Sequence, residues 1–269
     1  MDPIAVLILA LLQGLTEFLP ISSSGHLILV PHFFGWQDQG LAFDIAVHVG
    51  TLSAVIWYFR RDLMTMANAV MKSAVERQHP KAWSQQARLG WLVLFATLPA
   101  VIVGALFNDW IEQGLRTPAV IAVTTIGFGI LLWLADVKSQ RLRNESSVTW
   151  RDALLIGLAQ ALALIPGTSR SGITMTAGLM VGLDRAGAAR FSFLLSVPII
   201  FIAGLWKLIG LMQSPMSVNW GVLISATVLS AVTAYLCIEL FLRFLDRIGM
   251  MPFAIYRIAL GLLIFVFIA

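Results

Sequence analysis

Two short polar segments interrupt a chain that is otherwise apolar, and they resemble each other. The first is Gln13-Gly-Leu-Thr-Glu-Phe-Leu-Pro-Ile-Ser-Ser-Ser-Gly-His26, and the second is Gln160-Ala-Leu-Ala-Leu-Ile-Pro-Gly-Thr-Ser-Arg-Ser-Gly172. Each is a hydroxyl-rich loop, broken by proline and glycine, between two apolar runs of half the usual length. Ionisable groups are costly at membrane depth, so the two segments predict a functional site.

The composition is that of an integral membrane protein. The chain is 59% hydrophobic and 12% charged, with a mean hydropathy of +0.87, whereas soluble domains carry roughly 25% charged residues. No polar stretch is long enough for a second folded domain, so residues 1–269 are predicted to form a single membrane domain. The first segment lacks the features of a signal peptide, and we expect it to be retained. Membrane lipid is the expected partner, and nothing in the sequence indicates nucleic acid.

The hydropathy pattern predicts six transmembrane helices and two shorter helix pairs. A full span needs about 20 apolar residues. Residues 3–36 and 152–183 are instead each two half-length apolar runs around a polar loop, which is typical of re-entrant half-helices. The predicted fold is therefore an all-α polytopic membrane protein with two re-entrant pairs. The six spans are predicted at roughly residues 42–60, 89–107, 118–136, 190–211, 219–242 and 252–269.

The basic residues orient this layout. If the re-entrant pairs return to their starting side, both termini lie outside the cytoplasm, the first pair enters from outside, and the second enters from the cytoplasm. Cytoplasmic loops are expected to be rich in Lys and Arg. The segments on that side hold 14 of the 18 basic residues, namely Arg60, Arg61, Lys72, Arg77, Lys81, Arg88, Lys138, Arg141, Arg143, Arg151, Arg185, Arg190, Arg243 and Arg247.

A weak internal repeat supports two halves of opposite orientation, about residues 1–136 and 152–269. Each half carries one re-entrant pair and three spans, and three is odd, so the halves insert inverted. Inverted repeats with broken helices are a known transporter layout. A shift of 147 residues aligns Gln13 with Gln160, Ser22 with Ser169, Ser24 with Ser171 and Gly25 with Gly172, but also Glu17 with Leu164, Ser23 with Arg170 and His26 with Ile173.

The first loop carries groups for proton transfer and nucleophilic attack. Gln13 and Glu17 are four residues apart and share one helix face, and Pro20 ends that helix. The next half-helix begins with serines, which are favoured N-caps, and His26 lies one turn after Ser23. Exposed N–H groups at such a helix start bind anions. The serines are Ser22, Ser23 and Ser24, followed by Gly25.

The second loop repeats this pattern around Arg170. An arginine matches the oxygens of a phosphate better than a lysine does, and two facing helix N-termini with one arginine would hold a diphosphate. The predicted phosphate-binding groups of this loop are Thr168, Ser169, Ser171, Gly172 and Thr174.

Structural roles are the alternatives for each group taken alone. A serine cluster can simply cap a helix, and a buried glutamate or histidine can be a packing partner. Asp44 and His48 share a face at the outer end of the first full span. They could support the site residues from behind, or they could interact only with each other at the helix end. We expect Arg257 to have a structural or snorkelling role.

The two loops resemble those of the undecaprenyl-diphosphate phosphatase family of bacteria, also called the bacitracin-resistance family. The match covers a (Glu/Gln)-x-x-x-Glu motif at Gln13 and Glu17, then Pro-x-Ser-Ser-x-Gly-His from Pro20 to His26, and Pro-Gly-x-Ser-Arg-Ser-x-x-Thr from Pro166 to Thr174. The resemblance implies removal of the terminal phosphate of a C55 polyprenyl diphosphate. This reaction recycles the lipid carrier of peptidoglycan synthesis and confers bacitracin resistance.

The resemblance also implies site residues and a cofactor. The essential residues would be Glu17, Ser23, His26 and Arg170, and the activity would depend on a divalent cation, Mg²⁺ or Ca²⁺, with Glu17 as a metal ligand. This chain has Gln13 where some members of the family have Glu. The further substrate-binding residues are predicted to be Gln13, Ser22, Ser24, Gly25, Thr168, Ser169, Ser171, Gly172 and Thr174.

These inferences give one main hypothesis and two rivals. The main hypothesis is an inner-membrane phosphatase whose active site opens toward the periplasm. Ser23 is the nucleophile, with His26 or Glu17 as its base; direct attack by His26 is a variant. The rivals are a polyprenyl-phosphate transporter or flippase, and a non-catalytic lipid-binding protein. The oligomeric state, including a homodimer, stays open.

Overall fold

The computed structural model describes residues 2–37, 39–115, 117–212 and 219–267, and helices dominate this part of the chain. The predicted all-α fold is confirmed. The elements are α1 (Pro3–Thr16), α2 (Ser23–Phe34), α3 (Gly40–Tyr58), α4 (Arg60–Val75), η1 (Pro80–Ala82), α5 (Gln85–Gly114), α6 (Pro118–Lys138), η2 (Glu145–Ser147), α7 (Trp150–Leu162), α8 (Arg170–Met180), α9 (Arg185–Met212), α10 (Trp220–Ile248) and α11 (Met251–Phe267).

Five helices, α3, α5, α6, α9 and α10, are long and apolar enough to cross a membrane. Each overlaps one predicted span. Helices α5, α6 and α9 contain theirs, α10 begins one residue late, and α3 ends at Tyr58, two residues before the predicted end. Helix α5 begins earlier because Ser84 caps it, and α10 continues until Gly249, whose φ of +68° ends the helix. Helix α11 has 17 residues. Residues 268–269 of the predicted sixth span lie outside the described residues.

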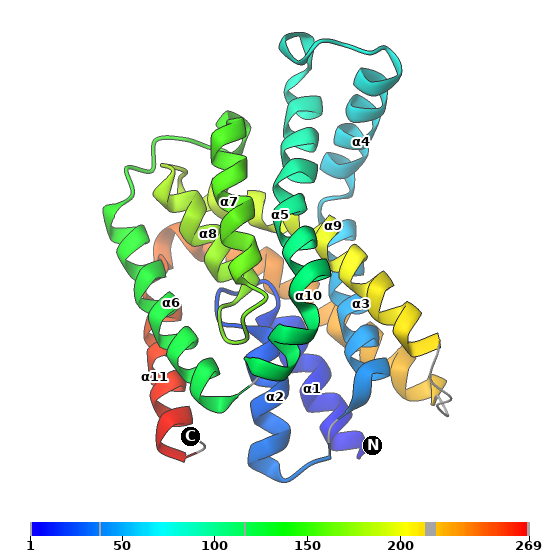
Figure 1. The fold of residues 1–269 in the computed structure, drawn as a ribbon, viewed down its shortest axis with the longest axis vertical. Coiled ribbons are helices and arrows are strands. Elements are labelled where there is room, and N and C mark those ends of the chain that lie inside the picture. The colour runs from blue at the N-terminus through cyan, green and yellow to red at the C-terminus, as the bar shows by residue number, and fades with distance from the viewer. Residues whose placement is uncertain (1, 38, 116, 213–218, 268–269) are drawn as a thin grey trace.

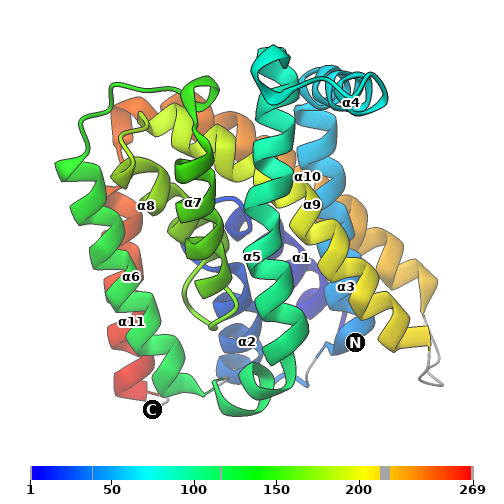
Figure 2. The same ribbon diagram turned by 45° about the horizontal axis from the view of Figure 1, so that its top comes forward.

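The two predicted helix pairs are present as half-length helices. Helices α1 and α2 have 14 and 12 residues, and α7 and α8 have 13 and 11. Figure 1 shows α1–α2 approaching from the end of the molecule that holds both termini, and α7–α8 from the opposite end. In both views the two connecting loops lie in the middle of the molecule (Figure 1, Figure 2).

A glycine makes the second loop compact. Gly167 has a φ of +87°, which glycine adopts without strain. A Cβ here would collide with the hydroxyl of Thr124 on α6 and would lie 2.6 Å from the carbonyl oxygen of Ile121. The Thr124 hydroxyl also donates to the carbonyl of Pro166 at 2.6 Å. The loop can therefore press directly against α6.

The two repeats interlock rather than pack side by side. Helix α1 packs on α10 of the other repeat, and α7 packs reciprocally on α5. Helices α6 and α11, which end the two repeats, pack against each other, and α3 packs on α10. Because each half-helix pair is held by the other repeat, the two loops are brought together at the centre.

Ion pairs close the end of the molecule that lies opposite both termini. Asp136 accepts hydrogen bonds from Nε and Nη2 of Arg185, both at 2.7 Å, and Arg143 bonds to Asp152 at 2.6 Å. Burial raises the pKa of Asp152, but the hydrogen bonds from Arg143 and from the Thr149 backbone together lower it by more. The pKa of Asp152 therefore lies below its ordinary value. Helix α4 projects at this same end (Figure 2).

Candidate active site

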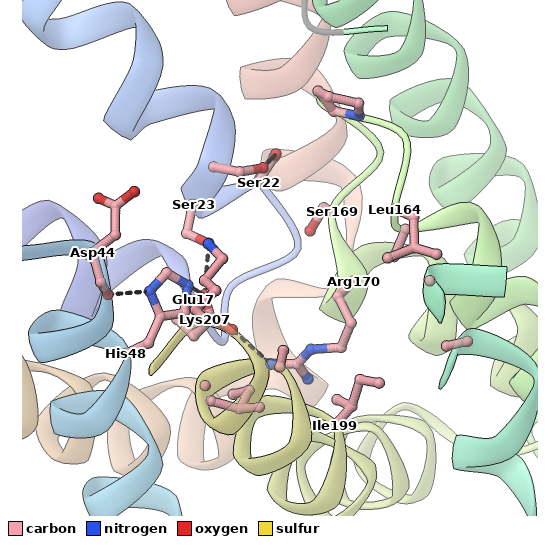
Figure 3. Close-up of a pocket in the computed structure, with 18 of the residues that line it drawn as sticks. Glu17, Ser22, Ser23, Asp44, His48, Leu164, Ser169, Arg170, Ile199 and Lys207 are labelled. Atoms are coloured by element: carbon pink, nitrogen blue, oxygen red, sulfur yellow. Dashed lines mark hydrogen bonds and ion pairs between the residues drawn. The ribbon is translucent and has the colours of Figure 1, made fainter. Parts of the chain in front are cut away.

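A cavity of about 320 Å³ lies where the two central loops meet. Both loops line it, together with faces of α3, α5 and α9. Figure 3 shows the polar side chains of the two loops directed toward the same space. The polar groups lining it include Glu17, Ser22, Ser23, Ser24, Asp44, His48, Gln160, Ser169, Arg170 and Lys207.

Glu17 is the residue to which Gln13, Ser23 and Arg170 all bond. It is the C-cap of α1 and is 9% exposed. Its Oε2 accepts a hydrogen bond from Ser23 Oγ at 2.6 Å and another from Gln13 Nε2 at 3.0 Å. Its Oε1 accepts from Arg170 Nη2 at 3.1 Å. A carboxylate that bonds to a serine hydroxyl can take the serine proton, and so can activate the serine as a nucleophile.

Ser23 and Arg170 hold the same position in their respective half-helices. Each is the first residue, and each follows a serine N-cap. Ser22 accepts from the Gly25 N–H at 3.4 Å, and Ser169 accepts from the Gly172 N–H at 3.1 Å. The positive ends of two helices therefore meet at the cavity, an arrangement that favours an anion.

Arg170 is fixed from two sides. Besides bonding to Glu17, it donates through Nη1 to the carbonyl of Ser192 on α9 at 3.2 Å. The guanidinium carbon lies 5.9 Å from the centre of the Phe18 ring. Behind it, the Thr174 hydroxyl bonds to the carbonyl of Arg170 at 2.8 Å and to the Ser192 hydroxyl at 2.7 Å. These contacts place the fork at the edge of the cavity.

His26 lies apart from this cluster. It is buried, and its Nδ1 donates to the carbonyl of Ser22 at 2.7 Å. Its Nε2 and the hydroxyl of Tyr256 on α11 are 2.5 Å apart, and the two rings are stacked. Both ring nitrogens are therefore engaged by the protein. The sequence suggested that His26 could contact Ser23, but the hydroxyl of Ser23 bonds to Glu17 instead.

The other predicted binding residues divide into two groups. Ser22, Ser24 and Ser169 line the cavity together with Glu17, Ser23 and Arg170. The rest lie behind it and hold the loops: Gln13 bonds to Glu17, Ser171 donates to the carbonyl of Leu19 at 2.8 Å, and Thr174 braces Arg170, while Gly25, Thr168 and Gly172 lie in the loop and helix backbone.

The structure adds residues that the sequence did not assign to the site. His48 Nδ1 donates to the carbonyl of Asp44 at 2.7 Å, and Nε2 lies 4.0 Å from Glu17 Oε2. Both residues line the cavity, so they belong to the site itself. Gln160 could have been found as the repeat partner of Gln13. Lys207 could have been found as the one basic residue in the outer half of α9.

The donor set does not fit a resident divalent cation. Among the described residues, no group of three or more His, Cys, Asp or Glu side chains is placed to hold a metal. Both oxygens of Glu17 are already engaged, one of them by a guanidinium. A hard cation such as Mg²⁺ usually takes one or two carboxylates plus substrate phosphates. Among the described residues, the carboxylates that line the cavity are Glu17 and Asp44, so an ion held there would also need oxygens from the substrate phosphates.

Together these features define a class of protein: a polytopic membrane protein in which a serine, a glutamate and an arginine are hydrogen-bonded together between two broken helices. The chain belongs to the bacitracin resistance protein BacA family, whose family model matches residues 6–263. The resemblance predicted from the two loops is therefore confirmed.

Similar proteins match along the whole chain. It is 55% identical over 269 residues to "Undecaprenyl-diphosphatase 2" of Stutzerimonas stutzeri (strain A1501), covering 99% of this chain and 98% of the relative. It is 55% identical to the "Undecaprenyl-diphosphatase" of Nitrosococcus oceani over 265 residues, and 55% identical to that of Hahella chejuensis over 266 residues. Each of these two alignments covers 98% of both chains.

Proposed function

We propose that this protein is a membrane phosphatase that converts undecaprenyl diphosphate to undecaprenyl phosphate and inorganic phosphate. The observation that carries this proposal is the Ser23–Glu17–Arg170 cluster between two helix N-termini. It combines a nucleophile, a proton acceptor and a phosphate-binding cation within hydrogen-bonding distance. The full-length relatives named undecaprenyl-diphosphatase support the substrate. The product would be the lipid carrier reused in peptidoglycan synthesis, which accounts for bacitracin resistance in the family.

In the first step Ser23 Oγ attacks the terminal phosphorus. Glu17 accepts the hydroxyl proton through the 2.6 Å hydrogen bond. The bond from the terminal phosphorus to the bridging oxygen breaks, and undecaprenyl phosphate leaves with the proton returned by Glu17. Arg170 and the N–H groups that begin α2 and α8 stabilise the transferring phosphate. Electrostatic positioning of this kind usually dominates phosphoryl transfer.

In the second step water hydrolyses the phosphoserine. Glu17 takes a proton from the attacking water, the phosphorus–Ser23 bond breaks, and Ser23 recovers its proton as inorganic phosphate leaves. His26, which bonds to the carbonyl of Ser22, holds the N-cap of the helix that presents Ser23. Its role in this proposal is to position the nucleophile.

Binding of the substrate changes the partners of Arg170. In the structure the guanidinium is bonded to Glu17 at 3.1 Å. The anionic terminal phosphate competes for the same donors, because phosphate matches the guanidinium fork. As the guanidinium turns to phosphate, Glu17 loses an opposite charge and becomes more basic toward Ser23. Binding and activation of the nucleophile are thus coupled.

The lipid tail leaves the site along apolar walls. Ala100 and Gly104 of α5 and Ile199, Ile200 and Ala203 of α9 line the same cavity as the polar cluster. The bacterial inner membrane is the proposed location. The cavity would open toward the periplasm, because the opposite end of the molecule carries the basic residues expected on the cytoplasmic side.

The expected Mg²⁺ or Ca²⁺ is proposed to arrive with the diphosphate rather than to reside on Glu17. Among the described cavity residues, Glu17 and Asp44 carry carboxylates that could contact it. If this is right, the purified protein without substrate should show weak Mg²⁺ binding by calorimetry, and a chelator should abolish turnover only by removing the ion from the substrate complex. Tight binding of stoichiometric Mg²⁺ without substrate would contradict this part of the proposal.

Phosphate release by the purified protein in detergent tests the function. Wild type should release phosphate from undecaprenyl diphosphate, and Ser23→Ala should not. Ser53→Ala, on an exposed face of α3, is the matched control and should be fully active. A rapid quench with labelled substrate should trap phosphate on Ser23. Label on His26, or turnover that survives in Ser23→Ala, would refute the serine mechanism.

The transporter alternative is favoured by one observation, the interlocked inverted repeats. In proteoliposomes it predicts movement of lipid phosphate across the bilayer that survives in Ser23→Ala. The phosphatase proposal predicts no dependence of phosphate release on such movement.

A further inference from the structure

Arg257 on α11 is a fully buried cation, and the part of the chain that the structure describes places no carboxylate beside it. It is 0% exposed. Among the described residues, no carboxylate oxygen lies within 4.0 Å of its nitrogens. Its guanidinium instead donates to backbone carbonyls. Two of these belong to α6: Nε bonds to Thr125 at 3.1 Å, and Nη2 to Thr124 at 3.4 Å. A buried charge with no counter-charge is expensive, so its presence calls for a role.

The remaining bonds of Arg257 reach both central loops. Nη1 donates to the carbonyl of Pro20 in the first loop at 3.3 Å. Nη2 donates to the carbonyls of Gly167 and Thr168 in the second loop at 2.9 and 2.8 Å. One rigid planar group thus joins two segments about 150 residues apart in the sequence.

The bonded carbonyls lie next to the catalytic helix starts. Pro20 is two residues before Ser22, the N-cap of α2, and Thr168 is directly before Ser169, the N-cap of α8. Ser23 and Arg170 follow these caps immediately. The distance between the nucleophile and the phosphate-binding cation therefore depends on how the two loops are held relative to each other.

We propose that Arg257 is a positioning residue for phosphate transfer, which holds the two loops in register so that Ser23 and Arg170 face the same phosphate. This inference rests on the proposed phosphatase function. The competing explanation is that Arg257 only anchors α11 to α6 through Thr124 and Thr125. The two explanations differ in which backbone loosens when the guanidinium is lost.

Kinetics of Arg257→Met and Arg257→Lys form the first test. Misplacing reacting groups by about 1 Å can cost about 100-fold in rate, so we expect kcat of Arg257→Met to fall by about that factor, with a smaller change in KM. Lysine has three donors and no fork, so Arg257→Lys should recover part of kcat. A kcat of Arg257→Met within about threefold of wild type would overturn the proposal.

Hydrogen exchange supplies a readout that does not depend on activity. In Arg257→Lys, backbone N–H groups at the start of α2 and at the start of α8 should exchange faster than in wild type. Faster exchange confined to α6 and α11 would establish the anchor explanation and overturn the proposal. If wild type releases no phosphate from undecaprenyl diphosphate, the proposed function fails, yet the exchange measurement still decides whether Arg257 holds the loops together.

A matched pair of glycine variants covers the case in which Arg257→Met does not fold. A Cβ at Gly129 of α6 would lie 2.9 Å from Cβ of Arg257, whereas a Cβ at Gly127 would meet nothing within 4 Å. Gly129→Ala should therefore shift Arg257 without removing its guanidinium. We expect a lower kcat and faster hydrogen exchange in both loops. Gly127→Ala should match wild type. Equal behaviour of the two variants in both measurements would overturn the proposal.

Discussion

Arg170→Lys tests whether the forked shape of the guanidinium, rather than its charge, is what the site needs. In the structure the fork spans two elements: Nη2 bonds to Glu17 at the end of α1, and Nη1 bonds to Ser192 on α9. A lysine has a single nitrogen on a flexible stem. It has no fork to reproduce the geometry of these two bonds, so the bond to Glu17 Oε1 or the bond to the Ser192 carbonyl is weakened or lost.

The expected cost differs between catalysis and folding. Losing one preorganised transition-state donor typically lowers kcat by about 10²–10³-fold, and we expect Arg170→Lys to fall in this range. Losing one hydrogen bond that involves a charged group costs about 1.5–3 kcal/mol of stability. That is less than the usual total stability of a folded domain, roughly 5–15 kcal/mol, so the variant should still insert and purify.

The assay is phosphate release from undecaprenyl diphosphate in detergent, with kcat measured at saturating substrate. Arg247→Lys is the matched control, since Arg247 is exposed near the end of α10, and it should behave as wild type. Thermal unfolding of the same samples separates lost activity from lost folding. If folded Arg170→Lys keeps kcat within about threefold of wild type, the fork does not contact the transferring phosphate and the mechanism is refuted.

Three further predictions use other parts of the molecule. Ser23→Ala should abolish turnover while leaving lipid binding measurable, whereas Ser24→Ala, at an exposed position, should lose far less; equal losses would remove Ser23 as nucleophile. The contribution of Asp152 to stability should be fully present above the ordinary Asp pKa of about 4 and should be lost as pH falls through its lowered folded pKa. Asp152→Asn should therefore make stability fall less steeply with decreasing pH below about 4. An unchanged pH dependence contradicts this. Cysteines at Lys81 and Asn219 should be labelled from opposite sides of the membrane in intact cells, the first only from the cytoplasm; labelling of both from one side would break the inverted topology.

Features set by local rules could be predicted from the sequence. Apolar run length predicts the half-helices, and the preference of serine for N-caps predicts that each serine cluster begins a half-helix. The structure shows that Ser22 and Ser169 are the capping residues of α2 and α8. These depend on a few neighbouring residues and on the cost of burying polar groups in lipid. The resemblance of the two loops likewise led to the family.

Features that depend on distant elements could not be predicted. The bond from Ser23 to Glu17 needs the turn in which Ser22 has a φ of 75°, a rare conformation for serine. The approach of His48 to Glu17 depends on how α3 packs beside α1. The carbonyls around Arg257 come from segments that no short-range pattern brings together. In each case tertiary packing decides the partner.

The two loops are one local structure used twice. Ser22 and Ser169 have φ angles of 75° and 69°, and each accepts from the glycine N–H three residues on. The hydroxyl pairs Ser22–Ser24 and Ser169–Ser171 are 3.3 and 3.2 Å apart. What differs is the chemistry placed on this shared frame, because Ser23 and Glu17 have Arg170 and Leu164 as their repeat partners.

This near-symmetry leads to a last prediction, in which the chemistry is exchanged between the loops. The double variant Ser23→Arg/Arg170→Ser puts a serine nucleophile on the second loop. The repeat partner of Glu17 in that loop is Leu164, which cannot accept a proton. The double variant should therefore be inactive. Leu164 lines the same cavity as Glu17. Adding Leu164→Glu and Glu17→Leu should therefore restore measurable phosphate release, with the phosphoserine now trapped at position 170. Folding of the fourfold variant is checked by its melting profile. If it folds but is as inactive as the double variant, then the second loop cannot replace the first as the setting for the nucleophile. The elements specific to the first loop, above all α3 with His48, would then be required for turnover.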